Sequence, residues 1–292
     1  MLPASSAAPA AKHTESYRAL SGLPPFPSVA TPLLNLLTDD DFETRKLVDI
    51  IRADSTFARE LLNSANSVEY GLQKEVSSIQ HAVAILGRDT LRSLAIAVSL
   101  KMYLGRVIQQ DMLARVWRHS LATAVISELL VEACGELRPG SCDETPYVAG
   151  LLHNVGCFGL MVVQPQQYAS ALARASRERK DLCEVERNPF GICHCEAGLL
   201  TARAWKFSPF IGEVASKHHE PVAEIEFNLV DLVKIAILVA DCVGYAIVPL
   251  EQTVTLDQIL EMLPASARTS FRHTPEAFRT SICERIGAFV RG

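Results

Sequence analysis

Apolar residues recur along most of this chain at the three- and four-residue spacing of amphipathic helices. In "FETRKLVDIIRADSTFARELLNSANS", Leu47, Ile50 and Ile51 share one stripe, a second stripe follows over residues 57–65, and "ADS" separates the two predicted helices. Patterns typical of strands are nearly absent. The pattern therefore predicts an all-α fold over residues 32–292.

Helix boundaries are marked by capping residues. Ser78 predicts a helix start, Gly87 predicts a stop, and a second helix is expected over about 90–104. Further starts are predicted where Ser or Thr precedes Pro, at Thr145-Pro146, Ser208-Pro209 and Thr274-Pro275. The pair of helices over 79–104 superficially resembles a helix-turn-helix, but its second helix is too apolar to read base edges. A buried core helix is the better interpretation.

Length and composition predict the organisation of the chain. A chain of 292 residues favours two domains, and we expect a disordered tail over 1–19, an N-terminal helical subdomain over 20–110 and a second helical domain over 111–292. With no apolar run long enough to cross a bilayer and no secretion signal, we expect a cytoplasmic protein that does not enter membranes. Its eight cysteines should then be free thiols. A net charge of -5 argues against nucleic acid as a partner. The oligomeric state is left open.

Five polar residues fall on the apolar faces of different predicted helices, which is an unusual place for them. They are His119, His153, His194, His218 and Asp241. His153 follows Ala149 and Gly150, so its face is small enough for another helix to come close. His219 is rotated from His218 by about 100°. A single inward histidine is more often structural than a ligand, but five such residues together favour a site.

The triplet Cys193-His194-Cys195 within "GICHCEAG" raises the question of a metal site. On a helix the two cysteines diverge by about 100° on either side of the histidine, and on a strand they face away from it. The triplet therefore should not bind one metal by itself. His194 is expected to join the distant histidines, and the cysteines are interpreted as packing residues.

Seven segments carry a family resemblance. In chain order they are "LPPFPSVATPLLNLLTDDD", "DIIRADSTFARELLNSANSVEYGL", "VSSIQHAVAILGRDTLRSLAIAVSL", "VWRHSLATA", "AGLLHNVG", "ERNPFGICHCEAGLLTARAW" and "ASKHHEP". Together they resemble the HDOD domain, the HD-related output domain, from about Leu23 to Pro221. The resemblance implies an HD-like helical domain preceded by an N-terminal helical subdomain, and a role in bacterial signal transduction rather than in established catalysis.

The HD superfamily binds metals through histidines and a His-Asp doublet. By position, the resemblance places the ligands at His119, His153, Asn154, His194, His218, His219 and Asp241. The doublet is His153-Asn154 here, so a neutral amide stands where the enzymes use a carboxylate that can bridge two metals. The "GYP" element that follows in the cyclic-dinucleotide phosphodiesterases is also missing after "HHEP". Both departures argue against a hydrolytic metal centre.

No cofactor follows with certainty from these residues. The histidines and Asp241 could hold one divalent transition metal of the Zn, Fe or Ni kind, line a ligand pocket, or form a hydrogen-bonded core. The favoured hypothesis is a non-enzymatic, response-regulator-like output protein that contacts unidentified signalling proteins. The alternative is a metal-dependent HD phosphohydrolase with an altered His-Asn site. A DNA-binding regulator that uses residues 79–104 is the weakest of the three.

Overall fold

The protein is helical throughout the part of the chain that the structure describes, and no strand occurs there. The computed structural model describes residues 7–24, 44–66, 76–108, 110–134, 145–222, 227–249, 254–270 and 274–291. The helices are α1 (Ala7–Ser21), α3 (Thr44–Arg52), α4 (Ser55–Ala65), α5 (Ile79–Val107), α6 (Gln110–Cys134), α7 (Pro146–Leu152), α8 (Val155–Val163), α9 (Pro165–Glu178), α10 (Leu182–Phe190), α11 (His194–Ala204), α12 (Pro209–Lys217), α13 (Leu229–Ala240), the π-helical turn η2 (Asp241–Tyr245), α14 (Leu256–Leu260), α15 (Ala265–Ser270) and α16 (Pro275–Arg291). The predicted all-α class is confirmed.

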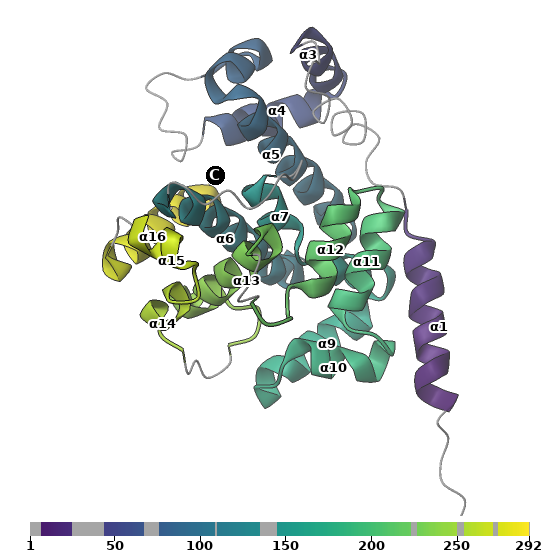
Figure 1. Ribbon diagram of the computed structural model, residues 1–292. Helices are drawn as coiled ribbons and strands as arrows, with labels where there is room; N and C mark the ends of the chain where they lie inside the picture. The colour runs from purple at the N-terminus through teal and green to yellow at the C-terminus, as the bar shows by residue number, and fades with distance from the viewer. Residues whose placement is uncertain are drawn as a thin grey trace, which may run out of the picture.

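Two apolar clusters organise these helices. The smaller one joins α3 and α4 to the first half of α5, through residues such as Ile51, Leu61 and Leu91. The larger one is built around α6, which packs against α7, α13 and α16, and it extends through α8, α11 and α12. In Figure 1 the two parts lie one above the other, with α5 descending from the smaller into the larger. Leu94 and Val98 of α5 belong to the smaller cluster, and Leu100 and Leu104 to the larger. The predicted division at residue 110 stays a prediction, because α5 serves both.

The predicted helix starts are present with their caps. The Ser78 hydroxyl accepts from the His81 N–H, Thr145 from Val148, Ser208 from Ile211 and Thr274 from Ala277. Gly87 has φ of 75°, a left-handed conformation that suits glycine, and it kinks α5 at the predicted stop. These features depend on residues close in sequence, which explains why the pattern locates them. Most of the segment over 23–41, the first of the seven that carry the family resemblance, lies outside the described residues.

The N-terminal segment differs from expectation, because α1 is a helix where residues 1–19 were expected to be a disordered tail; residues 1–6 lie outside the described part. Lys12 Nζ donates to the Asn188 carbonyl at 2.9 Å, and the buried Ser16 hydroxyl donates to the Phe190 carbonyl at 2.8 Å. Leu20 is fully buried against the larger cluster. Both carbonyls belong to the C-terminal turn of α10, where backbone acceptors lack helical partners. α1 therefore gains its order from contacts with residues more than 170 positions away.

One stretch, Pro146–Val163, is long and apolar enough to span a membrane by length and composition alone. It consists of α7 and α8 with a turn at His153 and Asn154 between them, and 83% of it is buried within the fold. That is the behaviour of core helices, and it gives only weak reason to consider a membrane.

Two glycines let helices approach closely beside this turn. A Cβ atom built on Gly150 would lie 2.7 Å from the Ala124 Cα atom of α6, and one built on Gly156 would collide with the His194 backbone carbonyl of α11. As predicted, the small helix face that contains Gly150, beside His153, allows another helix to come close. These contacts bring α6, α7, α8 and α11 to one point.

Gly156→Ala should lower the free energy of unfolding by about 3 kcal/mol, because the clash is with backbone atoms and a rigid core cannot absorb it. Gly105→Ala is the matched control. Gly105 is exposed in α5 with nothing within 4 Å of the added Cβ, so alanine there should raise the stability by about 0.4–1 kcal/mol. Urea unfolding of the three proteins measures both effects. Equal stability of Gly156→Ala and the wild type would show that the two helices can move apart.

Candidate functional site

The seven residues singled out in the sequence come together where helix ends meet within the larger cluster. His119 lies within α6, His153 and Asn154 lie between α7 and α8, His194 begins α11, His218 and His219 follow α12, and Asp241 follows α13. Five imidazoles form a continuous series in the order His119, His153, His218, His194, His219, with ring centroids 5.2, 5.1, 5.2 and 5.0 Å apart. We call this series the histidine row. All its members except His219 are buried.

Asp241 and Tyr245 close the first end of the histidine row. His119 Nδ1 lies 3.0 Å from the Tyr245 carbonyl and 3.4 Å from Asp241 Oδ1. Burial lowers the pKa of His119 to about 4 and raises the pKa of Asp241 to about 7. Both shifts favour the neutral forms. At neutral pH His119 is therefore an uncharged ring whose Nδ1–H is held by an oxygen acceptor.

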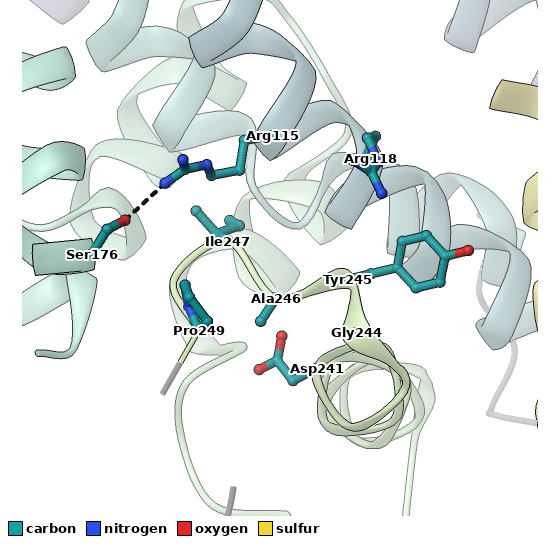
Figure 2. Close-up of a pocket in the computed structure, with 9 residues that line it drawn as sticks. All are labelled: Arg115, Arg118, Ser176, Asp241, Gly244, Tyr245, Ala246, Ile247 and Pro249. Atoms are coloured by element: carbon teal, nitrogen blue, oxygen red, sulfur yellow. Dashed lines mark hydrogen bonds between the residues drawn. The ribbon is translucent and has the colours of Figure 1, made fainter. Parts of the chain in front are cut away.

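Asp241 also faces a pocket of about 410 Å³ on the outer side of this end. Figure 2 shows its carboxyl group near Ala246, with Arg115 and Arg118 across the pocket. The Arg115 guanidinium donates to Ser176 at 2.8 Å, and that of Arg118 lies 5.9 Å from the centre of the Tyr245 ring. Both cations thus have partners within the protein. On the other side an open cleft of about 1070 Å³ reaches Asp241, His218 and His219 from solvent.

In the middle of the histidine row, the side chains of the adjacent residues His153 and Asn154 are hydrogen-bonded to each other. His153 Nδ1 lies 2.6 Å from the Gly150 carbonyl, so this nitrogen carries the proton and donates it. Burial holds the pKa of His153 well below its usual range, so the ring is neutral and Nε2 is an acceptor. The Asn154 amide Nδ2 lies 2.7 Å from Nε2 and donates to it, while Oδ1 accepts from the Cys157 thiol at 3.5 Å.

The hydrogen bonds of His153 and Asn154 determine whether these two residues can act as ligands in a metal centre like that of the HD enzymes. The only lone pair of the neutral His153 ring is engaged by an N–H of Asn154, so it is not free to bind an ion. Asn154 supplies no carboxylate to bridge two metals. The residues at 153 and 154 therefore do not fit the metal centre that the superfamily resemblance implies.

The far end of the histidine row depends on residues that the sequence did not single out. Glu186 is 0% exposed, and its Oε2 accepts from both the backbone N–H and the Nδ1–H of His194, each at 2.7 Å. Burial alone would lower the pKa of His194, but the charge and hydrogen bond of Glu186 outweigh it, so the pKa is raised. His194 Nε2 then faces the Nε2 atoms of His218 and His219, at 3.3 and 3.1 Å.

Cysteines also reach this end. Cys183 and Cys195 have sulfur atoms 3.7 Å apart, and both belong to a group with His194 and His219 whose ligand atoms all lie within 4.8 Å of one another. Cys195 was expected to be a packing residue, and Cys193 remains outside this group. The triplet was expected not to bind one metal by itself. Cys195 and His194 do belong to one possible ligand group, which Cys183 and His219 complete, and the Cys193 thiol contacts those of Cys183 and Cys195 without belonging to that group. The six described cysteines are free thiols, as expected.

A sequence signal existed for Glu186. It lies on the apolar stripe of α10, with Leu182 four residues before it, Val185 beside it and Phe190 four residues after it. The same reasoning that identified Asp241 as an inward carboxylate applies to it. Cys183 offers no such signal, because an inward cysteine resembles any other small apolar residue.

Comparison with known proteins places this geometry in a family context. The family model of the HDOD domain matches residues 23–221 of this chain. An HDOD domain protein from Geobacter sulfurreducens has the same fold, with a TM-score of 0.75, 22% identity and coverage of 97% of this chain and 96% of that one. A protein from Shewanella amazonensis SB2B named as a candidate phosphohydrolase gives a TM-score of 0.65 at 21% identity, covering 94% and 95%. A protein from Marinobacter aquaeolei VT8 named as a candidate signal transduction protein gives 0.71 at 19%, covering 97% and 66%.

A curated relative from Treponema pallidum, named only as an uncharacterized protein, is 25% identical over 221 residues. The match covers 72% of this chain but only 40% of that protein, so this chain spans less than half the length of the relative.

Acidification should destabilise the fold through His119. The unfolded side chain binds a proton near pH 6.5, but the folded one binds it only near pH 4, so between these values the unfolded state holds more protons and stability falls as pH is lowered. From pH 7 to pH 5 this loss is about 2 kcal/mol for His119.

The measurement is urea unfolding at both pH values with a chelator present, for the wild type and for His119→Gln. Gln keeps an N–H donor but does not titrate, so its loss of stability should be smaller by about 2 kcal/mol. In both proteins His194 and Asp241 titrate with the opposite sign to His119, and His153 and His218 with the same sign. The comparison therefore tests His119 through the difference between the two proteins and not through the total pH dependence of either. An identical pH dependence in the two proteins would contradict the assignment.

Proposed function

The chain belongs to the HDOD domain family, and from that premise we propose that it is a regulatory module of bacterial signal transduction without hydrolytic activity of its own. It acts through contacts with signalling proteins in the cytoplasm. The proposal is supported by a helical fold whose buried centre contains Asn154 at the position where the resemblance implies the carboxylate of an HD enzyme.

The observation that carries this proposal is the hydrogen bond from the Asn154 amide to His153 Nε2, at 2.7 Å. An HD enzyme needs this nitrogen and the following carboxylate as metal ligands, and a hydrolytic metal must also keep a position open for water. Here the nitrogen is engaged, the carboxylate is absent, and both side chains are at most 2% exposed. The doublet therefore supports a structural role.

The alternative is a metal-dependent phosphohydrolase that tolerates the altered doublet. It is favoured by the position of Asp241, whose carboxyl oxygen lies 3.4 Å from His119 Nδ1 and which two solvent-facing hollows reach. The names of the relatives divide in the same way, between a candidate phosphohydrolase and a candidate signal transduction protein. At about 20% identity, these names do not show which of the two functions this chain has.

Purified protein should show no hydrolysis of nucleotides, phosphomonoesters or cyclic dinucleotides that depends on His153. The assay supplies Mn²⁺, Fe²⁺ or Mg²⁺ and compares the wild type with His153→Ala, so that a contaminating enzyme, equally present in both preparations, is recognised. Turnover of any of these substrates that His153→Ala abolishes would overturn the proposal in favour of the phosphohydrolase.

Asn154→Asp should raise the affinity for Mn²⁺ by about tenfold or more, because it removes the amide donor from His153 Nε2 and adds a hard oxygen ligand. Asn154→Ala is the control, since it frees the nitrogen without supplying a carboxylate. Titration calorimetry with Mn²⁺ measures all three proteins. Equal, weak binding by Asn154→Asp and the wild type would mean that the amide is not what closes this centre.

A further inference from the structure

We propose that Cys183, His194, Cys195 and His219 form a tetrahedral Zn²⁺ site at the far end of the histidine row. Each residue offers one ligand atom, and these four atoms lie within 4.8 Å of one another. The site does not involve the doublet His153-Asn154 or Asp241. It shares His194 and His219 with the positions that the family resemblance assigns to metal ligands, and it adds Cys183 and Cys195, which that resemblance does not assign.

The separations of the ligand atoms match those around one zinc ion. With bonds of about 2.3 Å to sulfur and about 2.0–2.1 Å to nitrogen, a tetrahedral ion holds two sulfurs about 3.8 Å apart, two nitrogens about 3.3 Å apart, and a sulfur and a nitrogen about 3.6 Å apart. The distance between the sulfurs of Cys183 and Cys195 is 3.7 Å, and that between the Nε2 atoms of His194 and His219 is 3.1 Å. Cys183 Sγ lies 3.9 Å from His194 Nε2. These three separations are therefore each within about 0.3 Å of those around one tetrahedral ion, and all four ligand atoms lie within 4.8 Å of one another.

Glu186 prepares His194 for this role. Its buried carboxylate accepts the proton on Nδ1, so the unprotonated nitrogen of the neutral ring is Nε2, which points towards His219. A carboxylate behind a metal-binding histidine is the usual second partner in zinc sites, where it fixes the tautomer and the ring orientation. Glu186 also accepts the backbone N–H of His194, which fixes the start of α11.

Two facing imidazole nitrogens need a cation between them or a proton on one of them. His194 Nε2 and His219 Nε2 are at hydrogen-bond distance, and His194 Nε2 also lies near His218 Nε2 and Cys183 Sγ. When Zn²⁺ binds, the thiols of Cys183 and Cys195 release their protons to solvent, as does any imidazole nitrogen that shares one. The two thiolates then neutralise the charge of the ion.

The positions of the four ligands give an ion access from solvent, and they would let one ion hold three helices together. His219 is exposed and Cys183 is half-buried, whereas His194 and Cys195 are buried, so an ion can arrive from solvent and be held from inside. Cys183 lies in the first turn of α10, His194 and Cys195 begin α11, and His219 follows α12. One ion would thus join the ends of three helices. Thiolate and imidazole ligands in a tetrahedral S₂N₂ set select zinc.

The test uses the full chain, freed of metal with a chelator and titrated with Co²⁺ as a spectroscopic probe, then with Zn²⁺ against a chromophoric chelator. We expect one equivalent of Co²⁺ to give the visible spectrum of a tetrahedral ion together with a thiolate-to-cobalt charge-transfer band, and Zn²⁺ to displace it. A wild-type protein without the charge-transfer band would overturn the proposal, and this readout requires no variant to fold.

Variants then assign the ligands. Cys183→Ser and Cys195→Ser should each weaken Zn²⁺ binding by more than about 100-fold, and Glu186→Gln by about 10–100-fold, as for other outer partners of zinc ligands. Cys193→Ser is the control within the same cluster, because the buried Cys193 thiol contacts those of Cys183 and Cys195 but is not one of the four proposed ligands. It should retain binding within about threefold of the wild type. If Cys193→Ser loses the ion while Cys183→Ser keeps it, the proposed ligand set is wrong.

The outcome is separable from that of the proposed function. Zn²⁺ and Co²⁺ report on the thiolate site, whereas Mn²⁺ binding and His153-dependent hydrolysis report on the doublet at the middle of the histidine row. A zinc site in a protein without hydrolysis supports both proposals. Hydrolysis without a charge-transfer band overturns both.

Discussion

The arrangement of the buried centre depends on one carboxylate that water does not reach. A buried charge without partners costs several kcal/mol, so Glu186 can be held at 0% exposure only while its hydrogen bonds to His194 remain in place. These bonds hold the middle of α10 against the start of α11, together with the ion pair between Arg187 and Glu196, and they set which nitrogen of His194 faces inward. The raised pKa of His194 reflects the same contact with Glu186. The tautomer and the pKa of His194 thus depend on one carboxylate.

The other rings are brought to that fixed point by close backbone contacts. Gly150 lets α7 lie against α6, and Gly156 lets the start of α8 lie against the His194 carbonyl, so a side chain at either glycine would push the row apart. His153 sits between these two contacts, with both ring nitrogens hydrogen-bonded within a single turn of chain. The same tight packing therefore brings the imidazoles together and keeps both ring nitrogens of His153 hydrogen-bonded, so that no nitrogen of His153 is available to bind a metal.

The sequence predicts those features whose causes are local. Caps such as Ser78 and Thr145 bond to atoms three residues away, and helical periodicity alone turns His119 and His218 inward. It fails where the cause is distant. α1 is ordered by carbonyls at the end of α10, which no local pattern records. Cys183 and Cys195 meet because α10 packs against α11, where Glu186 bonds to His194 and Arg187 pairs with Glu196, so a spacing rule applied to the triplet around His194 cannot find Cys183.

The two ends of the histidine row consequently differ in chemistry. Near Asp241 the polar groups are a neutral imidazole and a carboxyl group whose pKa burial raises to about 7. Near Cys183 they are sulfur and nitrogen atoms at the spacing of one ion. Four protein ligands complete a tetrahedron and leave no position for a water nucleophile, which is the mark of structural rather than catalytic zinc. A metal at this end would stiffen the domain, and this agrees with a module that transmits signals through its shape.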